Sequence, residues 1–326
     1  IFLKLKKLMI SILNKKDIKN TLLIVLAFLS IYIIWGSTYL FNKIALNEIA
    51  PLLLASIRFT ISAALIFILS KLLGLSIKIN LKQALNCCLA GFLFLGFGNG
   101  ALVWSLQYID SSLAALETSL QPLVVLILMR IFEGKKISFL SFIGVLLGFF
   151  GMFLLVNQNE IIGNENSYIA IFMIFLCMIS WAFASLFVAK AELPKNFFVN
   201  TAYQMLFASI FLFAGSIFFN ETWSNPSDWS SSVKGALFFL IIFGSIIAFT
   251  SFNFLLKKVS PEKVSTSNYI NPIVAVILGW YFLDEKITNQ TILASCILLL
   301  GVFFINSKRK LVIFQAYKSK FRKIKT

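Results

Sequence analysis

Ten apolar stretches of about 20 residues follow one another along the chain, and they constrain its fold more than any other feature. A helix needs about 20 predominantly apolar residues to cross a bilayer. Isolated strands would leave backbone groups unpaired in lipid, so all ten stretches are expected to be helices. Hydrophobic residues make up 59% of the chain and charged residues 13%, whereas soluble domains are about 45–50% apolar and about 25% charged. The sequence therefore predicts an all-α integral membrane protein with spans near 21–41, 51–72, 84–106, 111–132, 137–156, 167–188, 197–219, 233–256, 262–282 and 287–306.

The composition also argues against several classes of function. This much apolar surface excludes a soluble enzyme, because a soluble fold could not cover it with polar groups. The chain has no histidine, and its four cysteines all lie in apolar stretches without the spacing of a metal site or a disulfide framework. No GxxxxGK[ST] phosphate-binding loop is present. We therefore expect no cofactor, no metal and no direct use of ATP.

Lysine and arginine positions predict the orientation of the chain in the membrane. Cytoplasmic loops of membrane proteins carry the excess of positive charge. If the N-terminus is cytoplasmic, 25 of the 29 basic residues fall in cytoplasmic segments, and the outer loops hold only Lys43, Lys234 and Lys286. Arg58 remains inside a span. This split predicts an even number of spans and two cytoplasmic termini. It also explains the net charge of +16, so we expect a lipid bilayer and no nucleic acid as partner.

The two halves of the sequence repeat each other. Trp35 precedes Arg58 by 23 residues, and Trp181 precedes Gln204 by the same 23. Likewise, both Pro122 and Pro272 stand 15 residues before an isoleucine. Each half therefore holds five spans, and an odd number turns the second copy upside down in the membrane. Inverted repeats of this kind are a transporter architecture, with the substrate site near the midplane between the halves.

Several segments resemble the EamA domain, the repeat unit of the drug/metabolite transporter superfamily. They are the run from Trp35-Gly36-Ser37-Thr38-Tyr39 through Pro51 to Phe59, the segments around Pro122 and Pro272, and the ending Leu283-Asp284-Glu285-Lys286-Ile287-Thr288. The first copy departs from the family pattern, because Lys135 stands where an acidic residue is usual. The resemblance divides the chain into a basic N-terminal segment (1–20), a first repeat (21–156), a second repeat (167–306) and a basic tail (307–326).

The resemblance implies a central cavity. Helices one to four and six to nine would surround it, while helices five and ten would stand outside as supports. It also implies a bacterial cytoplasmic (inner) membrane location, a small-molecule substrate such as an amino acid or a nucleoside, and export as the direction of transport.

Two charged residues lie at membrane depth, where each needs a partner or a task. Arg58 and Glu117 both sit about 9–11 Å below the outer ends of their helices, at 1.5 Å per residue, so an ion pair between them is possible. In one reading they gate the cavity, grip a charged substrate or, for Glu117, couple transport to protons. In the other they form a permanent structural pair. For Arg58 we favour the structural role, because family members commonly carry arginine there.

Uncharged polar and aromatic residues supply the remaining site candidates. Pro122 and Pro272 each free a backbone carbonyl one turn earlier, which could contact a ligand or act as a hinge. Tryptophan rings could stack on a ligand or a cation. For each Asn or Gln, hydrogen bonding between helices is the alternative reading. The predicted substrate-binding residues are Trp35, Thr38, Asn42, Asn99, Trp104, Glu117, Thr118, Gln121, Trp181, Ser185, Asn253, Asn268, Tyr269 and Asn271, and the predicted gating or coupling residues are Arg58, Glu117, Pro122 and Pro272.

These features favour a secondary active transporter that works by alternating access. A lipid-carrier flippase of the same fold is the alternative. A membrane enzyme is disfavoured, because it would need acids, histidines or an active serine clustered at one interface. The outer acids are scattered across loops, and we interpret them as solvating the outer surface: Asp110, Glu160, Glu165, Glu221, Asp228, Asp284 and Glu285.

Overall fold

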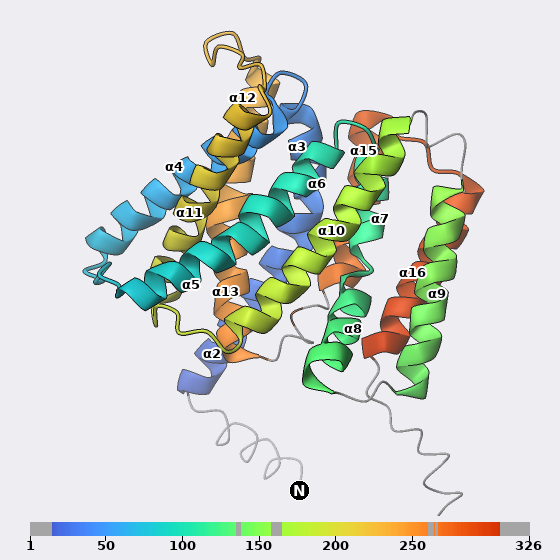
Figure 1. The fold of residues 1–326 in the computed structure, drawn as a ribbon, viewed down its shortest axis with the longest axis horizontal. Coiled ribbons are helices and arrows are strands. Elements are labelled where there is room, and N and C mark those ends of the chain that lie inside the picture. Colours follow the sequence, from blue (N-terminus) through green and yellow to red (C-terminus); the bar gives the residue numbers. More distant parts are fainter. Residues whose placement is uncertain (1–14, 135–137, 158–164, 260–263, 265–266, 307–326) are drawn as a thin grey trace, which may run out of the picture.

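The computed structural model describes residues 15–134, 138–157, 165–259, 264 and 267–306. Every regular element in these ranges is a helix (Figure 1). Seven helices are long and apolar enough to cross a membrane, and three shorter helices are also apolar. This confirms the predicted all-helical, multi-pass membrane fold. The prediction of basic terminal segments falls largely outside the described residues.

The first half of the chain forms four long apolar helical segments, three of them interrupted, and one shorter apolar helix. Here η marks a π-helical segment, in which the backbone winds more loosely than in an α-helix. The elements in order are α2 (Lys15–Leu29), η1 (Ser30–Ile34), α3 (Trp35–Ala45), α4 (Pro51–Leu72), α5 (Leu81–Gly91), η2 (Phe92–Asn99), α6 (Gly100–Ser105), α7 (Ser111–Thr118), α8 (Gln121–Glu133) and α9 (Phe139–Val156).

The second half follows the same plan. Its π-helical segment η3 lies in the span equivalent to the one that contains η2. The elements in order are α10 (Glu165–Val188), α11 (Phe197–Phe218), α12 (Ser231–Phe239), η3 (Leu240–Ile247), α13 (Ala248–Lys258), α15 (Ser267–Leu283) and α16 (Asn289–Asn306).

Equivalent helices of the two halves pack against each other. Helix α4 lies along α11, and α9 lies along α16. The α9–α16 pair stands at one side of the bundle (Figure 1), and its helices approach closely through glycines. A Cβ atom on Gly301 would lie 2.8 Å from the carbonyl oxygen of Gly144, and one on Gly151 would lie 2.8 Å from the Leu298 side chain. Such small-residue contacts let helix backbones meet in lipid.

The buried cores contain residues of both halves, and these shared cores join the halves into one body. One core cluster combines Leu116 and Leu120 with Met178 and Leu298. Large apolar side chains cover the outside, among them Phe149 and others on the lipid-facing helix surfaces. This distribution suits a bilayer, where apolar side chains facing outward meet lipid tails rather than water.

Candidate functional site

Helix irregularities gather at the centre of the bundle. Three of the spans pass through the π-helical segments η1, η2 and η3. Such segments are rare and occur frequently at functional sites. Asn271 accounts for part of η1: in the amide orientation that satisfies its neighbours, its nitrogen donates to the carbonyl oxygens of Ile31 at 3.0 Å and Tyr32 at 2.8 Å. The side chain thus holds backbone groups that a regular helix would pair internally.

The fourth span is broken at its predicted proline. Helix α7 ends at Thr118, and α8 begins at Gln121 with Pro122 in its first turn. Proline lacks an N–H group and clashes with the preceding turn, so it fits the start of a helix better than its interior. By contrast, Pro272 lies inside α15. Neither proline lines the central cavity, and their roles as hinges stay predictions.

A cavity of about 110 Å³ lies among these irregular segments. Residues from both halves of the chain line it, as expected for a site between repeats. Nine of the predicted site residues are in the lining: Trp35, Thr38, Arg58, Asn99, Thr118, Gln121, Trp181, Asn268 and Asn271. The rest of the lining consists of Tyr39, Phe59, Leu95, Leu102, Cys177, Gly244 and Phe249. The structure thus brings these predicted residues together, and their contact with substrate stays a prediction.

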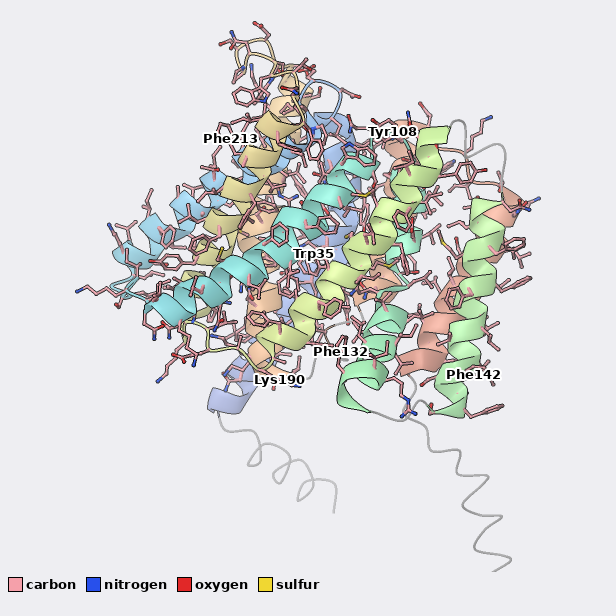
Figure 2. All side chains as sticks on the ribbon, viewed as in Figure 1. Trp35, Tyr108, Phe132, Phe142, Lys190 and Phe213 are labelled. Atoms are coloured by element: carbon pink, nitrogen blue, oxygen red, sulfur yellow. The ribbon has the colours of Figure 1, made fainter. Side chains whose placement is uncertain are left out.

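Aromatic rings form one wall of this cavity. The rings of Trp35 and Trp181 meet edge to face, with centroids 5.9 Å apart. Phe252 packs against Trp35 at 5.1 Å and against Trp181 at 5.7 Å. The indole N–H of Trp35 donates to the carbonyl oxygen of Gly244 at 3.3 Å. Figure 2 shows Trp35 in the middle of the bundle, so the wall stands at the centre of the molecule.

Arg58 lies in the lining without an acidic partner. Its side chain is only 4% exposed. Its Nε donates to Ser245 Oγ at 2.7 Å, and the guanidinium lies 5.0 Å from the Phe59 ring centroid. Its terminal nitrogen Nη1 is buried and makes no hydrogen bond. No ion pair joins Arg58 to Glu117 in the described part of the chain, so the ion pair considered from the sequence does not form.

Glu117 is buried at the end of α7, close to the break in the fourth span. Its side chain is 2% exposed, and its Oε2 atom has no hydrogen-bond partner. Tyr39 and Cys177 lie close enough to interact electrostatically with its carboxyl group. The neighbouring Thr118 shares a 2.6 Å hydrogen bond with the Tyr39 hydroxyl. Glu117 itself is not in the cavity lining.

Four further predicted residues are not in the lining of the central cavity: Asn42, Trp104, Ser185 and Asn253. Asn42 is buried on α3 with an unpartnered Oδ1, and Trp104 packs against Tyr108 with ring centroids 4.9 Å apart. Ser185 and Asn253 line a separate pocket, described below. The side chain of Tyr269 is outside the described residues.

The second pocket, of about 210 Å³, lies between the ends of α10, α11 and α13. A buried amide network forms part of it. Asn253 accepts a hydrogen bond from Asn200 at 3.2 Å and donates to Thr201 at 3.0 Å. Gln204 donates to Asn200 at 3.1 Å. The network links α11 to α13. Asn253 therefore forms hydrogen bonds between helices, which was the alternative to its predicted contact with substrate.

Sequence reasoning missed several groups around Arg58 and the cavity. Gly244 and Ser245 belong to η3, and Tyr39 and Cys177 are ordinary apolar-run residues in the sequence. The repeat contains a signal for Gly244 and Ser245, because η2 begins at residue 92 and η3 at the equivalent residue 240. The glycine-rich segment that forms η2 therefore predicts irregular backbone around Gly244 in the second half. No sequence signal marks Cys177.

A loop carboxylate caps the N-terminus of α7. Glu285 is 6% exposed and accepts the backbone N–H groups of Ser111 at 2.7 Å and Ser112 at 3.0 Å. A helix N-terminus offers unpaired donors and a positive partial charge, so a carboxylate there is stabilising. Nearby, burial and the Glu285 charge raise the pKa of Asp110, while Lys43 opposes the shift. Interpreting Glu285 as a loop residue that solvates the outer surface is therefore wrong.

A second carboxylate caps the N-terminus of α4. Glu221 accepts the N–H groups of Leu52 and Leu53, both at 2.9 Å, so its interpretation as a solvating acid is also wrong. Glu48 in turn accepts the N–H of Ser230 at 2.8 Å, next to the start of α12. Each of these contacts joins one half of the chain to the other.

Two similar sets of apolar helices, interrupted at the centre around a shared cavity, define a membrane transporter of the repeat type. The chain belongs to the EamA-like transporter family, whose sequence profile matches residues 22–157 and 168–307. It is a multi-pass protein of the bacterial inner membrane.

Individual relatives agree with this assignment. The chain is 32% identical to the "uncharacterized inner membrane transporter YedA" of Escherichia coli K12, over 86% of this chain and 89% of YedA. It is 23% identical to the "uncharacterized transporter YoaV" of Bacillus subtilis, over 88% of this chain and 99% of YoaV. A solved structure titled only "Crystal structure of protein" superposes with a TM-score of 0.63 at 20% identity, over 86% of this chain and 95% of the other. That likeness shows the fold alone.

Proposed function

We propose that this protein is a secondary active transporter that moves small metabolites across the inner membrane by alternating access. The central cavity carries the proposal, because residues from both family domains line it and irregular helices surround it. Irregular backbone at membrane depth is tolerated where it lines a cavity or is buried in protein, and transporters use it at their substrate sites. Tilting one half against the other would expose such a cavity to each side of the membrane in turn.

The proposed topology has ten spans in two inverted halves, with both chain ends in the cytoplasm. The seven long apolar helices and the three shorter ones supply ten candidates. The distribution of basic residues supplies the orientation. A green fluorescent protein fused to the C-terminus would test this, since it is expected to fluoresce only if that end is cytoplasmic.

The proposed driving force is a proton or substrate gradient, with Glu117 as the proton-coupling group. Its support is its burial and its unpartnered Oε2 atom beside the break in the fourth span. A carboxyl group buried at membrane depth is costly to keep without a task. Export is proposed as the direction because of the resemblance to exporters of this superfamily.

Counterflow in proteoliposomes tests the function. Vesicles preloaded with an unlabelled metabolite panel would be diluted into the same compounds in labelled form, and accumulation of label would establish transport. Glu117→Gln should abolish proton-driven uptake and spare exchange. Asp228→Asn, at an exposed carboxylate of an outer loop, is the matched control and should preserve both.

Two outcomes would contradict parts of the proposal. If Glu117→Gln leaves proton-driven uptake intact, Glu117 is not the coupling group. If folded protein exchanges no compound of the panel, metabolite transport is rejected in favour of a lipid-carrier flippase of the same fold, which transbilayer movement of a labelled polyprenyl phosphate would then test.

A further inference from the structure

The central cavity carries one positive charge and no negative one. Arg58 is the charged member of its lining, and no aspartate or glutamate is among the lining residues that the structure describes. Glu117 is buried close by, yet it is outside the lining and not paired with Arg58. Arginine stays protonated in proteins. An empty cavity would therefore hold an uncompensated cation.

The guanidinium has donor capacity left for a ligand. Its Nε is fixed by Ser245 at 2.7 Å, and Phe59 lies beside it at 5.0 Å. The Nη1 atom is buried and unpartnered. A buried donor without a partner costs free energy, and more so when it is charged. A carboxylate oxygen is the acceptor that best matches this group, because charge-assisted bonds between arginine and carboxylate are short and strong.

A second buried atom in the lining, an amide oxygen, also lacks a hydrogen-bond partner. Asn99 lines the same cavity, and its Oδ1 atom is buried without a hydrogen-bond partner. An amide oxygen accepts hydrogen bonds and donates none. A ligand that satisfies both side chains therefore carries a carboxylate for Arg58 and a hydroxyl or similar donor for Asn99.

The size of the cavity limits the ligand. Its volume is about 110 Å³, whereas an apolar cavity of about 150 Å³ is known to hold benzene. A ligand of about four to six non-hydrogen atoms therefore matches the size of the cavity in this conformation. Nucleosides are much larger, and their uncharged base and sugar would leave Arg58 unpaired.

We propose that the transported substrate is a small carboxylate of net negative charge that also carries a hydroxyl donor, with Arg58 binding the carboxylate and Asn99 accepting from the hydroxyl. This rests on the proposed function and narrows it to one substrate class. A zwitterion also offers Asn99 a donor, but it fits less well because its ammonium group would add a second positive charge to a lining whose described residues include no acid. The aromatic wall of Trp35 and Trp181 encloses the rest of the molecule.

Four compounds of nearly equal size test which charged and hydrogen-bonding groups the site prefers. Lactate carries the carboxylate and the hydroxyl, propionate lacks the hydroxyl, lactamide lacks the charge, and alanine adds an ammonium group. Binding would be measured by thermal shift in detergent, and exchange by counterflow in proteoliposomes. Lactate should bind about 10- to 100-fold more tightly than lactamide, the range expected for one hydrogen bond to a charged group. Alanine and propionate should also be weaker than lactate.

Matched variants assign the effect to the two side chains. Arg58→Gln should lower lactate affinity to that of lactamide, whereas Arg130→Gln, at the exposed end of α8, should not change it. Asn99→Ala should abolish the preference for lactate over propionate. Thr250→Val is its control, since Thr250 Oγ1 is also buried and unpartnered but lies outside the cavity lining.

The outcomes separate this inference from the proposed function. Equal binding of lactamide and lactate, or preferred exchange of alanine, would overturn the anion site while transport stands. Exchange of other panel compounds, with neither binding nor exchange of lactate, would also overturn the anion site while transport stands. Lactate binding that depends on Arg58 without any exchange would support the anion site and reject transport. If a folded Arg58→Gln protein keeps full lactate affinity, the assignment to Arg58 is wrong.

Discussion

Trp35 and Trp181 hold the same position in the two halves of the chain, and their indole rings meet edge to face with centroids 5.9 Å apart. Each stands 23 residues before an equivalent residue of the next helix, Arg58 in α4 or Gln204 in α11. This contact places the two equivalent residues at the interface between the halves. A transporter that rocks one half against the other would move these rings relative to each other.

Gly98 sets the position of Trp181. A Cβ atom at Gly98 would lie 2.6 Å from both Cδ1 and Nε1 of the indole, closer than van der Waals contact allows, so Gly98→Ala must displace the ring. Overpacking of this kind costs about 1–3 kcal/mol. We expect substrate exchange in proteoliposomes to fall by about tenfold, which corresponds to about 1.4 kcal/mol.

Gly235→Ala is the matched control for this prediction. Gly235 lies in α12 with nothing near the site of an added Cβ. Exchange should be unchanged, and the folded yield of both variants is read by size-exclusion chromatography. Normal exchange by Gly98→Ala would mean that the ring position of Trp181 does not limit transport.

Arg58 is expected to lower the free energy of unfolding. A buried charge without an ionic partner is strongly unfavourable, and well-packed apolar replacements for buried charged groups are often stabilising by about 1–4 kcal/mol. Arg58→Met removes this charge at the expense of the hydrogen bond to Ser245. We expect the free energy of unfolding to rise by about 1–3 kcal/mol, seen as a higher thermal midpoint. Arg130→Met, at an exposed arginine, should leave the midpoint in place, and a lower midpoint for Arg58→Met would refute the prediction.

The sequence predicted the all-helical membrane fold and its duplication, because apolar runs and repeat spacing are local properties. The spacing of Trp35 and Trp181 identified them as equivalent residues of the repeat. Both Pro122 and Pro272 were predicted to disturb their helices, yet only Pro122 lies at the start of a new helix, and Pro272 lies inside α15.

The pairing of side chains could not be predicted in the same way. Arg58 and Glu117 have matching depths, yet depth fixes only the height of a residue along its helix. Which direction it faces depends on how the helix is rotated in the bundle, and Arg58 meets Ser245 instead. The role of Glu285 was missed for a related reason: its place beside α7 follows from the packing of α15 against α7, and nothing in its own loop indicates a capping role.

The cap that Glu285 places on α7 should contribute measurably to stability. Both carboxylate oxygens accept backbone N–H groups, from Ser111 and Ser112. Glu285→Ala leaves these two donors without the carboxylate and should lower the free energy of unfolding by about 1–3 kcal/mol. Glu285→Gln keeps one acceptor oxygen and should lose less. Asp228→Ala, at an exposed outer acid, serves as the control in the same thermal unfolding series, and equal effects at the two positions would argue against the cap.

Asp110 should make stability depend on pH in the opposite sense to an ordinary paired carboxylate. Burial, followed by the charge of Glu285, raises the pKa of Asp110 in the folded protein, and Lys43 only partly offsets this. A carboxyl group with a raised folded pKa binds its proton more tightly in the folded state, so its contribution is favourable at low pH. That contribution is lost as the pH rises through the folded pKa. Asp110→Asn should therefore raise the thermal midpoint at pH 7, and the gain should shrink as the pH falls toward about 4, the ordinary pKa of aspartate. The midpoints of both proteins, measured from pH 4 to pH 7 beside Asp228→Asn, test this, and a gain that grows toward low pH would show that the sign is wrong.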